Sequence, residues 1–332
     1  MIVGISDELF SNDAKFRELY SIILLCTLNE RNKILIGSHA VFDSVNFKRF
    51  HKMDQDILNL QFVSLSRTVN DPDLKVTAVE TNSTFSCEEA LLYLLQPVSI
   101  ILENSLNDRP FIEAIFKHFD DTNILEKHVN QNWITFDNAG GSGGIINIIN
   151  GKFRSMASWP KKDKKGYLRC YVILDSDKLT STTALKNDKQ KVVEYLTRNN
   201  IKHHVLNKRE MENYIPEATL LEIDDHYLNE YCKLATIQKD FFDLEKGLVT
   251  DRNSKNAKKE ILDFYETISD KSWDILKVGI DCEDYNRGNF KSEFSKLFRK
   301  NTVNKTSLIL RCGGTTYDNE LLTIVNEIKS LL

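Results

Sequence analysis

Apolar and polar positions follow a helical period in the first part of the chain and change to short apolar runs further along. In residues 15–33, apolar side chains recur at three- and four-residue spacing, which predicts a helix. Short apolar runs at 33–38, 60–66 and 73–81 predict strands. We therefore expect residues 1–96 to form an N-terminal α/β appendage.

From residue 85 onward, predicted helices and strands alternate. Ser86 and Glu89 stand at capping-box spacing, and together with Pro97 they bound a predicted helix over 85–97. A second helix is expected at 109–119, with Pro110 in its first turn. A third, amphipathic helix is expected over 186–200. The four predicted strands lie in the segments 98–104, 132–139, 168–178 and 201–207.

This alternation predicts a parallel α/β sheet with helices beside it. The part of the chain after Pro216 is polar, and its apolar spacing is mostly helical. An apolar run at 307–312 predicts one more strand, followed by a glycine turn and the segment 319–332. The expected organisation is thus an appendage (1–96), an α/β domain (97–216) and a mainly helical C-terminal extension (217–332).

Acidic residues follow three of the four predicted strands. Glu103 follows the first strand, Asp175 and Asp177 follow the third, and Glu210 and Glu212 come soon after the fourth. The second strand ends in Asp137, Asn138 and the glycine-rich stretch at 140–144. Because parallel strands present their carboxyl ends at one edge of a sheet, these carboxylates should meet there.

Clustered carboxylates repel one another and need a counter-charge. A hard divalent cation with oxygen ligands supplies it, and Mg²⁺ typically binds one or two carboxylates, waters and substrate phosphate. Two such ions, Mg²⁺ or Mn²⁺, about 4 Å apart would activate a water and stabilise the leaving oxygen of a phosphodiester. The chain has no cysteine–histidine cluster, which argues against zinc.

The order of these acidic residues resembles the Toprim domain, which is shared by topoisomerases, DnaG-type primases and the OLD family of nucleases. "ILENSLND" (101–108), "DSD" (175–177) and "REMENYIP" (209–216) carry the resemblance to the OLD-like members. It covers residues 97–216 and implies a Toprim-like parallel four-stranded sheet flanked by helices. It also implies metal-dependent cleavage of DNA or RNA, often in bacterial anti-phage defence and frequently beside an ATPase.

The resemblance assigns roles to single residues. Glu103 matches a metal ligand or general base, and Asp175 and Asp177 match the paired aspartates. Glu212 best matches the last glutamate, with Glu210 as its rival. The remaining matches are Asp108, which lies five residues after Glu103 where many members have four, Asn104, which replaces a usual glycine, and Lys208, which would contact a phosphate.

Two further segments suit phosphate contacts. The turn at 140–144 opens a helix, so the N–H groups of Gly140 and Gly141 would approach a phosphate. The segment 152–169 carries a charge of +6, which leaves −10 for the remainder of a chain whose net charge is −4. Its central lysines form either a nucleic-acid contact or an ordinary solvated loop; they are Lys161, Lys162, Lys164 and Lys165.

Other features of the sequence bear on the expected location and partners of the protein. The six scattered cysteines favour reduced thiols and a cytoplasmic location, and the longest early apolar run, 19–28, is too short to span a bilayer. The chain contains no P-loop, so we expect that it does not hydrolyse ATP itself, and the resemblance implies a separate ATPase or sensor partner. A nucleic-acid substrate is expected, and assembly into a homo-oligomer is compatible with the sequence.

Three other functions use similar residues. A phosphatase of the haloacid-dehalogenase type also has a DxD pair after a strand, although its motif continues differently from "KL" (178–179). A topoisomerase or primase shares the carboxylates but needs more machinery; a topoisomerase requires a tyrosine nucleophile in a large separate domain, for which 332 residues leave little room. A non-catalytic Toprim module that serves only assembly would have no need for the complete set of carboxylates.

Overall fold

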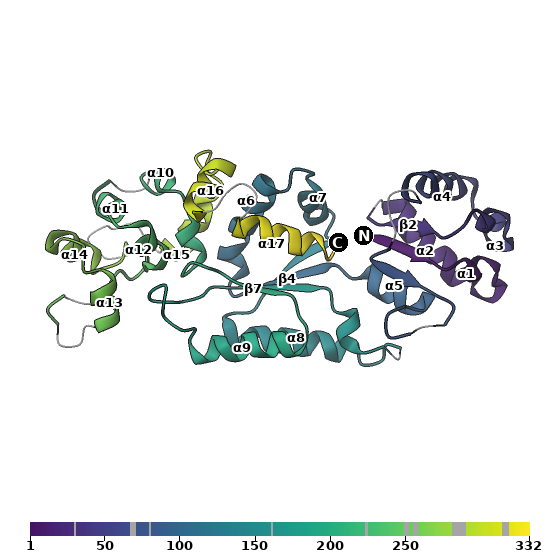
Figure 1. The fold of residues 1–332 in the computed structure, drawn as a ribbon, viewed down its shortest axis with the longest axis horizontal. Helices are drawn as coiled ribbons and strands as arrows, with labels where there is room; N and C mark the ends of the chain where they lie inside the picture. The colour runs from purple at the N-terminus through teal and green to yellow at the C-terminus, as the bar shows by residue number, and fades with distance from the viewer. Residues whose placement is uncertain are drawn as a thin grey trace. The chain divides into compact units, whose positions relative to one another are not determined.

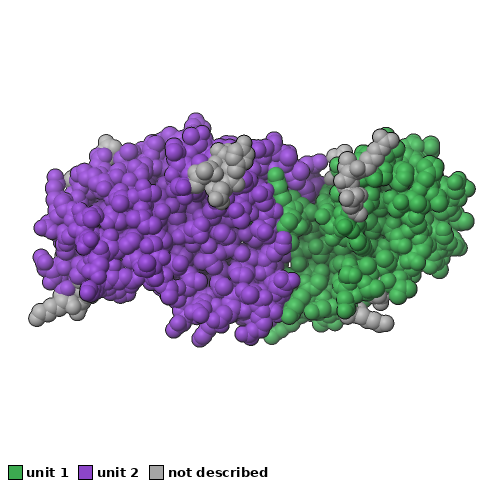
Figure 2. All heavy atoms as spheres, in the orientation of Figure 1, with its two compact units in different colours: residues 1–98, 151–169, 328–332 green, residues 99–150, 170–327 purple. Residues whose placement is uncertain are grey.

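The computed structural model describes residues 1–29, 31–66, 71–79, 81–160, 162–222, 225–248, 252–254, 258–280, 290–313 and 319–332. The chain folds into two compact units, coloured separately in Figure 2. Unit 1 consists of Met1–Val98, Gly151–Arg169 and Ile328–Leu332, and unit 2 of Ser99–Asn150 and Cys170–Glu327. The α/β segment and the C-terminal extension therefore share one unit, whereas the N-terminal appendage gains two later segments.

Unit 1 contains a three-stranded parallel sheet in the order β2-β1-β3. Its strands are β1 (Ile2–Ile5), β2 (Lys33–Ile36) and β3 (Leu74–Val76). β2 and β3 fall within predicted strands, whereas the sequence pattern does not predict β1. The helices are α1 (Asp7–Ser11), α2 (Phe16–Asn29), α3 (Val45–Arg49), α4 (Lys52–Leu65) and α5 (Cys87–Leu95).

The strand predicted at 60–66 is wrong, since these residues continue helix α4. Leu58 and Leu65, seven residues apart, are buried on one face, whereas Leu60 and Val63 are exposed. Exposed apolar residues made the segment resemble a strand. The capping box of α5 is confirmed: Glu89 N–H donates to Ser86 Oγ (3.3 Å), and Ser86 N–H donates to Glu89 Oε2 (3.0 Å).

Unit 2 contains a four-stranded parallel sheet in the order β5-β4-β6-β7. The strands are β4 (Val98–Leu102), β5 (Ile134–Asn138), β6 (Cys170–Leu174) and β7 (His203–Val205). Every residue of β4 and β6 is buried, as expected for central strands covered on both faces. The predicted α/β class with parallel sheets is confirmed.

Helices cover both faces of this sheet. Figure 1 shows α8 (Ser142–Ser155) and α9 (Asn187–Arg198) along one face, and α6 (Ser105–Phe119), α7 (Ile124–Asn130) and α17 (Glu320–Lys329) on the other. Helix α6 begins four residues earlier than predicted, so Pro110 lies inside it rather than in its first turn. The earlier start coincides with a hydrogen bond from Asn104 N–H to Asp108 Oδ2 (2.8 Å).

The chain after Pro216 is helical in the residues described. The strand predicted at 307–312 is wrong, because Asn304 Oδ1 accepts a hydrogen bond from Ser307 N–H (3.0 Å) and caps helix α16 (Lys305–Cys312). Leu308 is buried while Leu310 is exposed, a helical pattern. No helix in the described residues is long and apolar enough to cross a membrane. The other helices are α10 (Glu217–Leu220), α11 (Asp225–Cys232), α12 (Thr236–Phe241), α13 (Lys259–Phe264), α14 (Asp270–Leu276) and α15 (Phe290–Leu297).

Candidate metal-binding carboxylate site

The site lies at the carboxyl ends of the strands of unit 2, where the direction of chain progression reverses. From β4 the chain continues to β5 on one side and then crosses to β6 on the other. The carboxyl ends of β4 and β6 therefore flank a topological switch point, the usual ligand position in open parallel sheets. Glu103 follows β4 directly, and Asp175 follows β6 directly.

A cavity of about 470 Å³ opens at this position. It contains every acidic residue that the sequence proposed as a metal ligand, together with both candidate glycines. We call it the carboxylate cavity, and its lining residues are Glu103, Asn104, Asp108, Asn138, Gly140, Gly141, Asp175, Asp177, Glu210, Glu212 and Phe294.

Asp175, the residue directly after β6, carries a strongly perturbed carboxyl group. Its Oδ1 atom is buried and has no hydrogen-bond partner among the described residues. Burial is the main reason why the pKa of Asp175 lies well above its ordinary range. Negative charges add to this rise, and they belong to Asp108, Glu210 and Glu103. An unpaired oxygen within a group of carboxylates is a natural position for a cation ligand.

The residues between the two aspartates connect the ends of β6 and β7. The buried Ser176 hydroxyl donates to Lys208 O (2.6 Å), and Asp177 N–H donates to Arg209 O (2.9 Å). Asp177 has a φ of 50°, an uncommon conformation for aspartate, which these bonds maintain. The same bonds hold the start of the glutamate segment beside Asp175 and Asp177.

Glu210 and Glu212 both face the cavity, because Met211–Tyr214 forms a short 3₁₀ helix after an extended Glu210. Glu210 Oε1 accepts a bond from Arg209 Nε (3.3 Å). Burial, followed by the charge of Glu210 and a hydrogen bond with it, raises the pKa of Glu212 well above its ordinary range. The two glutamates thus repel each other when both are ionised.

Lys189 supplies a cation that the sequence analysis missed. Its buried Nζ lies 2.7 Å from Glu103 Oε1, 2.7 Å from Asp175 O and 2.9 Å from Asp177 Oδ2. Burial lowers the pKa of Lys189, but the nearby carboxylates outweigh it and raise that pKa, so the ammonium stays charged. Burial raises the pKa of Glu103, and Lys189 opposes that rise.

The donor set suits a hard divalent cation, although the side chains are not arranged around one. Within the described parts of the chain, no three acidic, imidazole or thiol groups stand close enough together to hold one ion. Lys189 engages Glu103 and Asp177 instead. Carboxylate oxygens, including the unpaired Oδ1 of Asp175, are the ligands that Mg²⁺ and Mn²⁺ prefer, so these side chains suit either ion. Some of the side chains must change position before they can surround it.

The glycine turn joins the ends of β4 and β5. Gly141, at a φ of 112°, donates its N–H to Glu103 O (2.9 Å), and Gly140 N–H donates to Asn138 Oδ1 (3.3 Å). Both amides predicted to face phosphate thus have partners within the chain. The turn does open helix α8, as the sequence predicts.

The predicted basic residues lie elsewhere. Lys208 pairs with Asp240 and does not line the carboxylate cavity. In unit 1, Lys162 Nζ donates to three carbonyls, including Thr84 O (2.9 Å), and Lys164 Nζ donates to Trp159 O (2.6 Å). Lys165 is exposed, and Lys161 lies outside the described residues. The contact with nucleic acid expected of these lysines stays a prediction.

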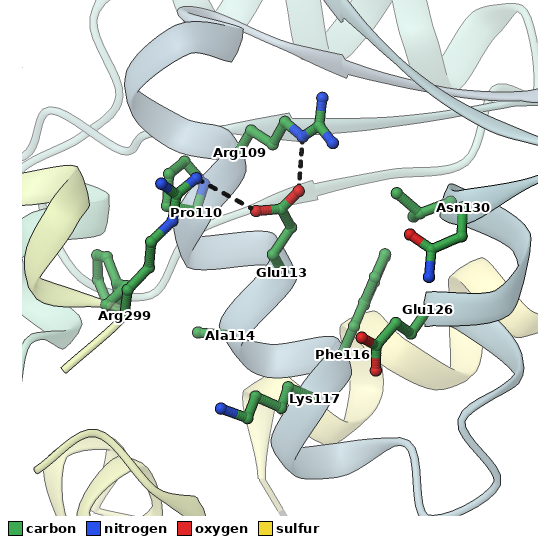
Figure 3. A pocket seen from close by; sticks show the side chains of 11 residues that line it. Arg109, Pro110, Glu113, Ala114, Phe116, Lys117, Glu126, Asn130 and Arg299 are labelled. Atoms are coloured by element: carbon green, nitrogen blue, oxygen red, sulfur yellow. Dashed lines mark hydrogen bonds and ion pairs between the residues drawn. The ribbon is translucent and has the colours of Figure 1, made fainter. Parts of the chain in front are cut away.

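A second cavity of about 320 Å³ lies along helix α6, which also contributes Asp108 to the carboxylate cavity (Figure 3). Arg109 Nε is 2.7 Å from Glu113 Oε1, and an Arg299 nitrogen is 3.7 Å from Glu113 Oε2. Figure 3 shows both arginines directed at this one carboxylate. Their charges are partly satisfied by Glu113, and this cavity has no cluster of carboxylates like the first.

Comparison of the chain with protein-family models, curated proteins and solved structures gave no match.

Proposed function

We propose that the carboxylate cavity is the active site of a metal-dependent nuclease of the Toprim type, similar to the OLD family, that hydrolyses phosphodiester bonds of DNA or RNA. The observation that carries this proposal is the convergence of six acidic residues on one cavity at the switch point. The buried, unpaired Oδ1 of Asp175 adds a ligand atom without a partner among the described residues.

A purely structural explanation of the acidic residues accounts for some of them only. Asp108 bonds the Asn104 N–H at the start of α6, and Glu103 and Asp177 pair with Lys189. No such bond accounts for the Asp175 Oδ1 atom within the described residues, and folding gains nothing from its repulsion by neighbouring carboxylates. Binding of a divalent cation would account for this unfavourable arrangement of carboxylates.

The residues of the cavity divide the chemical work. When bound, Mg²⁺ or Mn²⁺ supplies positive charge for the scissile phosphate and lowers the pKa of a coordinated water. Asp175, Asp108 and the Glu210–Glu212 pair would hold it. Lys189 fixes the orientation of Glu103 next to Asp175.

The protein would act as an effector in anti-phage defence together with an ATPase or sensor protein. Support for the partner comes from the resemblance and from the absence of a P-loop in the sequence. Purification from native cells tests it: co-purification of a P-loop protein supports the partner, and recovery of this chain alone counts against it.

The proposed activity is tested with plasmid, single-stranded DNA and total RNA, each incubated with Mg²⁺, Mn²⁺ or EDTA. We expect divalent-dependent cleavage of at least one substrate, lost with EDTA and with Asp175→Asn. A parallel reaction on a generic phosphatase substrate, with and without vanadate or beryllofluoride, tests the phosphatase alternative. Vanadate-sensitive phosphate release without nucleic-acid cleavage would replace the nuclease with a phosphatase.

A further inference from the structure

The ammonium of Lys189 has three acceptor oxygens around it inside the site. An ammonium group has three N–H donors. Lys189 donates hydrogen bonds to Glu103 Oε1 and to Asp175 O, and its ammonium forms an ion pair with Asp177 Oδ2 at 2.9 Å. Its side chain is only 3% exposed. This lysine is therefore an internal component of the carboxylate site and not a surface residue that approaches it.

Helix α9 holds the ammonium in this place. Val192 and Leu196, three and seven residues after Lys189, are buried on the same face of the helix. The lysine stem leaves this packed face, and its charged end reaches the carboxyl ends of β4 and β6. A lysine anchored in this way has few other positions to adopt, so it is a fixed positive charge.

The position of Lys189 divides the acidic residues into two groups. Glu103 and Asp177 each have one oxygen engaged by the ammonium. Asp175 instead has its Oδ1 atom unpaired, and the charges that most affect its carboxyl group are those of Asp108 and Glu210. The acidic oxygen of the cavity that has no partner among the described residues is therefore on Asp175, which Lys189 contacts only at its backbone carbonyl.

We propose that Lys189 is a resident cation of the site, which takes the place of a second divalent ion by holding Glu103 and Asp177. The native chain then binds one Mg²⁺ or Mn²⁺, next to Asp175, and not the two ions expected from the sequence. This inference rests on the proposed function, because it assumes that the cavity binds a divalent cation. Lys189 is a positioning residue and makes no contact with substrate in this account.

The number of bound Mn²⁺ ions tests the proposal without measuring activity. Free Mn²⁺ is followed by electron paramagnetic resonance during titration of the pure chain at neutral pH. We expect one ion per native chain, one for K189R, which keeps the charge, and two for K189M. The matched control is K191M, an exposed lysine two residues along the same helix, which should bind one ion.

Circular dichroism accompanies each titration, because K189M leaves two carboxylates without their partner. If K189M does not fold, the proposal is tested by the number of Mn²⁺ ions bound to K189Q and to the native chain. Two ions in the native chain, or one ion in a folded K189M or K189Q, would overturn the proposal while leaving the nuclease function intact. A native chain that binds no Mn²⁺ and cleaves no nucleic acid would remove the proposed function, and this inference with it.

Discussion

Replacing Asp175 with asparagine should change activity and stability in opposite directions. Asparagine keeps the shape of the side chain and removes the charge that repels Asp108, Glu210 and Glu103. Burial and these charges disfavour the ionised carboxyl and raise the pKa of Asp175 in the folded chain, where each tenfold change in proton affinity corresponds to about 1.4 kcal/mol that the neutral amide does not lose. We therefore expect Asp175→Asn to stabilise the metal-free chain by about 1–2 kcal/mol while abolishing divalent-dependent cleavage.

Thermal unfolding in EDTA measures the stability part of this prediction. For a folding unit of about 150–250 residues, 1 kcal/mol corresponds to about 2–4 °C in Tm. The variant should thus melt about 2–8 °C above the native chain, and added Mn²⁺ should raise its Tm less. Asp177→Asn is the matched comparison, since it loses the bond to Lys189 and should melt lower. An Asp175→Asn chain that melts several degrees below native would show that Asp175 serves the fold, as a helix cap or turn residue.

The remaining predictions concern the neighbours of Asp175 and its titration. Glu212→Gln should eliminate Mg²⁺-dependent cleavage and Glu210→Gln should reduce it partly, since Arg209 already engages Glu210; the reverse ranking in a cleavage assay would exchange their roles. The stability gain of Asp175→Asn should be absent below about pH 3.8, where the carboxyl is protonated in both states. It should grow as pH rises from there to the elevated folded pKa, because only the unfolded chain ionises in this range, and level off above it. A gain independent of pH in melting curves would refute this. Gly141→Ala, at a φ of 112°, should lower Tm and cleavage by distorting the turn that bonds Glu103 O, whereas Gly143→Ala, with open space around it and no such φ, should change neither measurably.

The acidic residues of the site were predictable because strand periodicity and strand ends are local properties of the sequence. A buried apolar run that stops at Glu103 or Asp175 identifies both the strand and the residue at its exposed end. The parallel arrangement then brings such ends together. Lys208, assigned a phosphate contact from the resemblance, lies three residues beyond β7, where it pairs with Asp240 and does not line the cavity.

Lys189 shows what sequence patterns leave out. Its contacts with Glu103 and Asp177 join residues 86 and 12 positions away, which no local pattern specifies. One signal did exist: a lysine at helical spacing from Val192 and Leu196 lies on an apolar face, where an unpaired ammonium would be costly. The strands wrongly predicted at 60–66 and 307–312 have the opposite cause, since exposed leucines there imitate buried ones.

The most direct test of the central claim is the rate of nucleic-acid cleavage as a function of Mn²⁺ concentration, measured side by side for the native chain and Asp175→Asn. We predict a rate for the native chain that rises with Mn²⁺ and saturates, and no detectable rate for the variant at any concentration, although it remains folded. Equal cleavage by both chains, or cleavage that persists in EDTA, would contradict the assignment of the carboxylate cavity as a metal-dependent nuclease site.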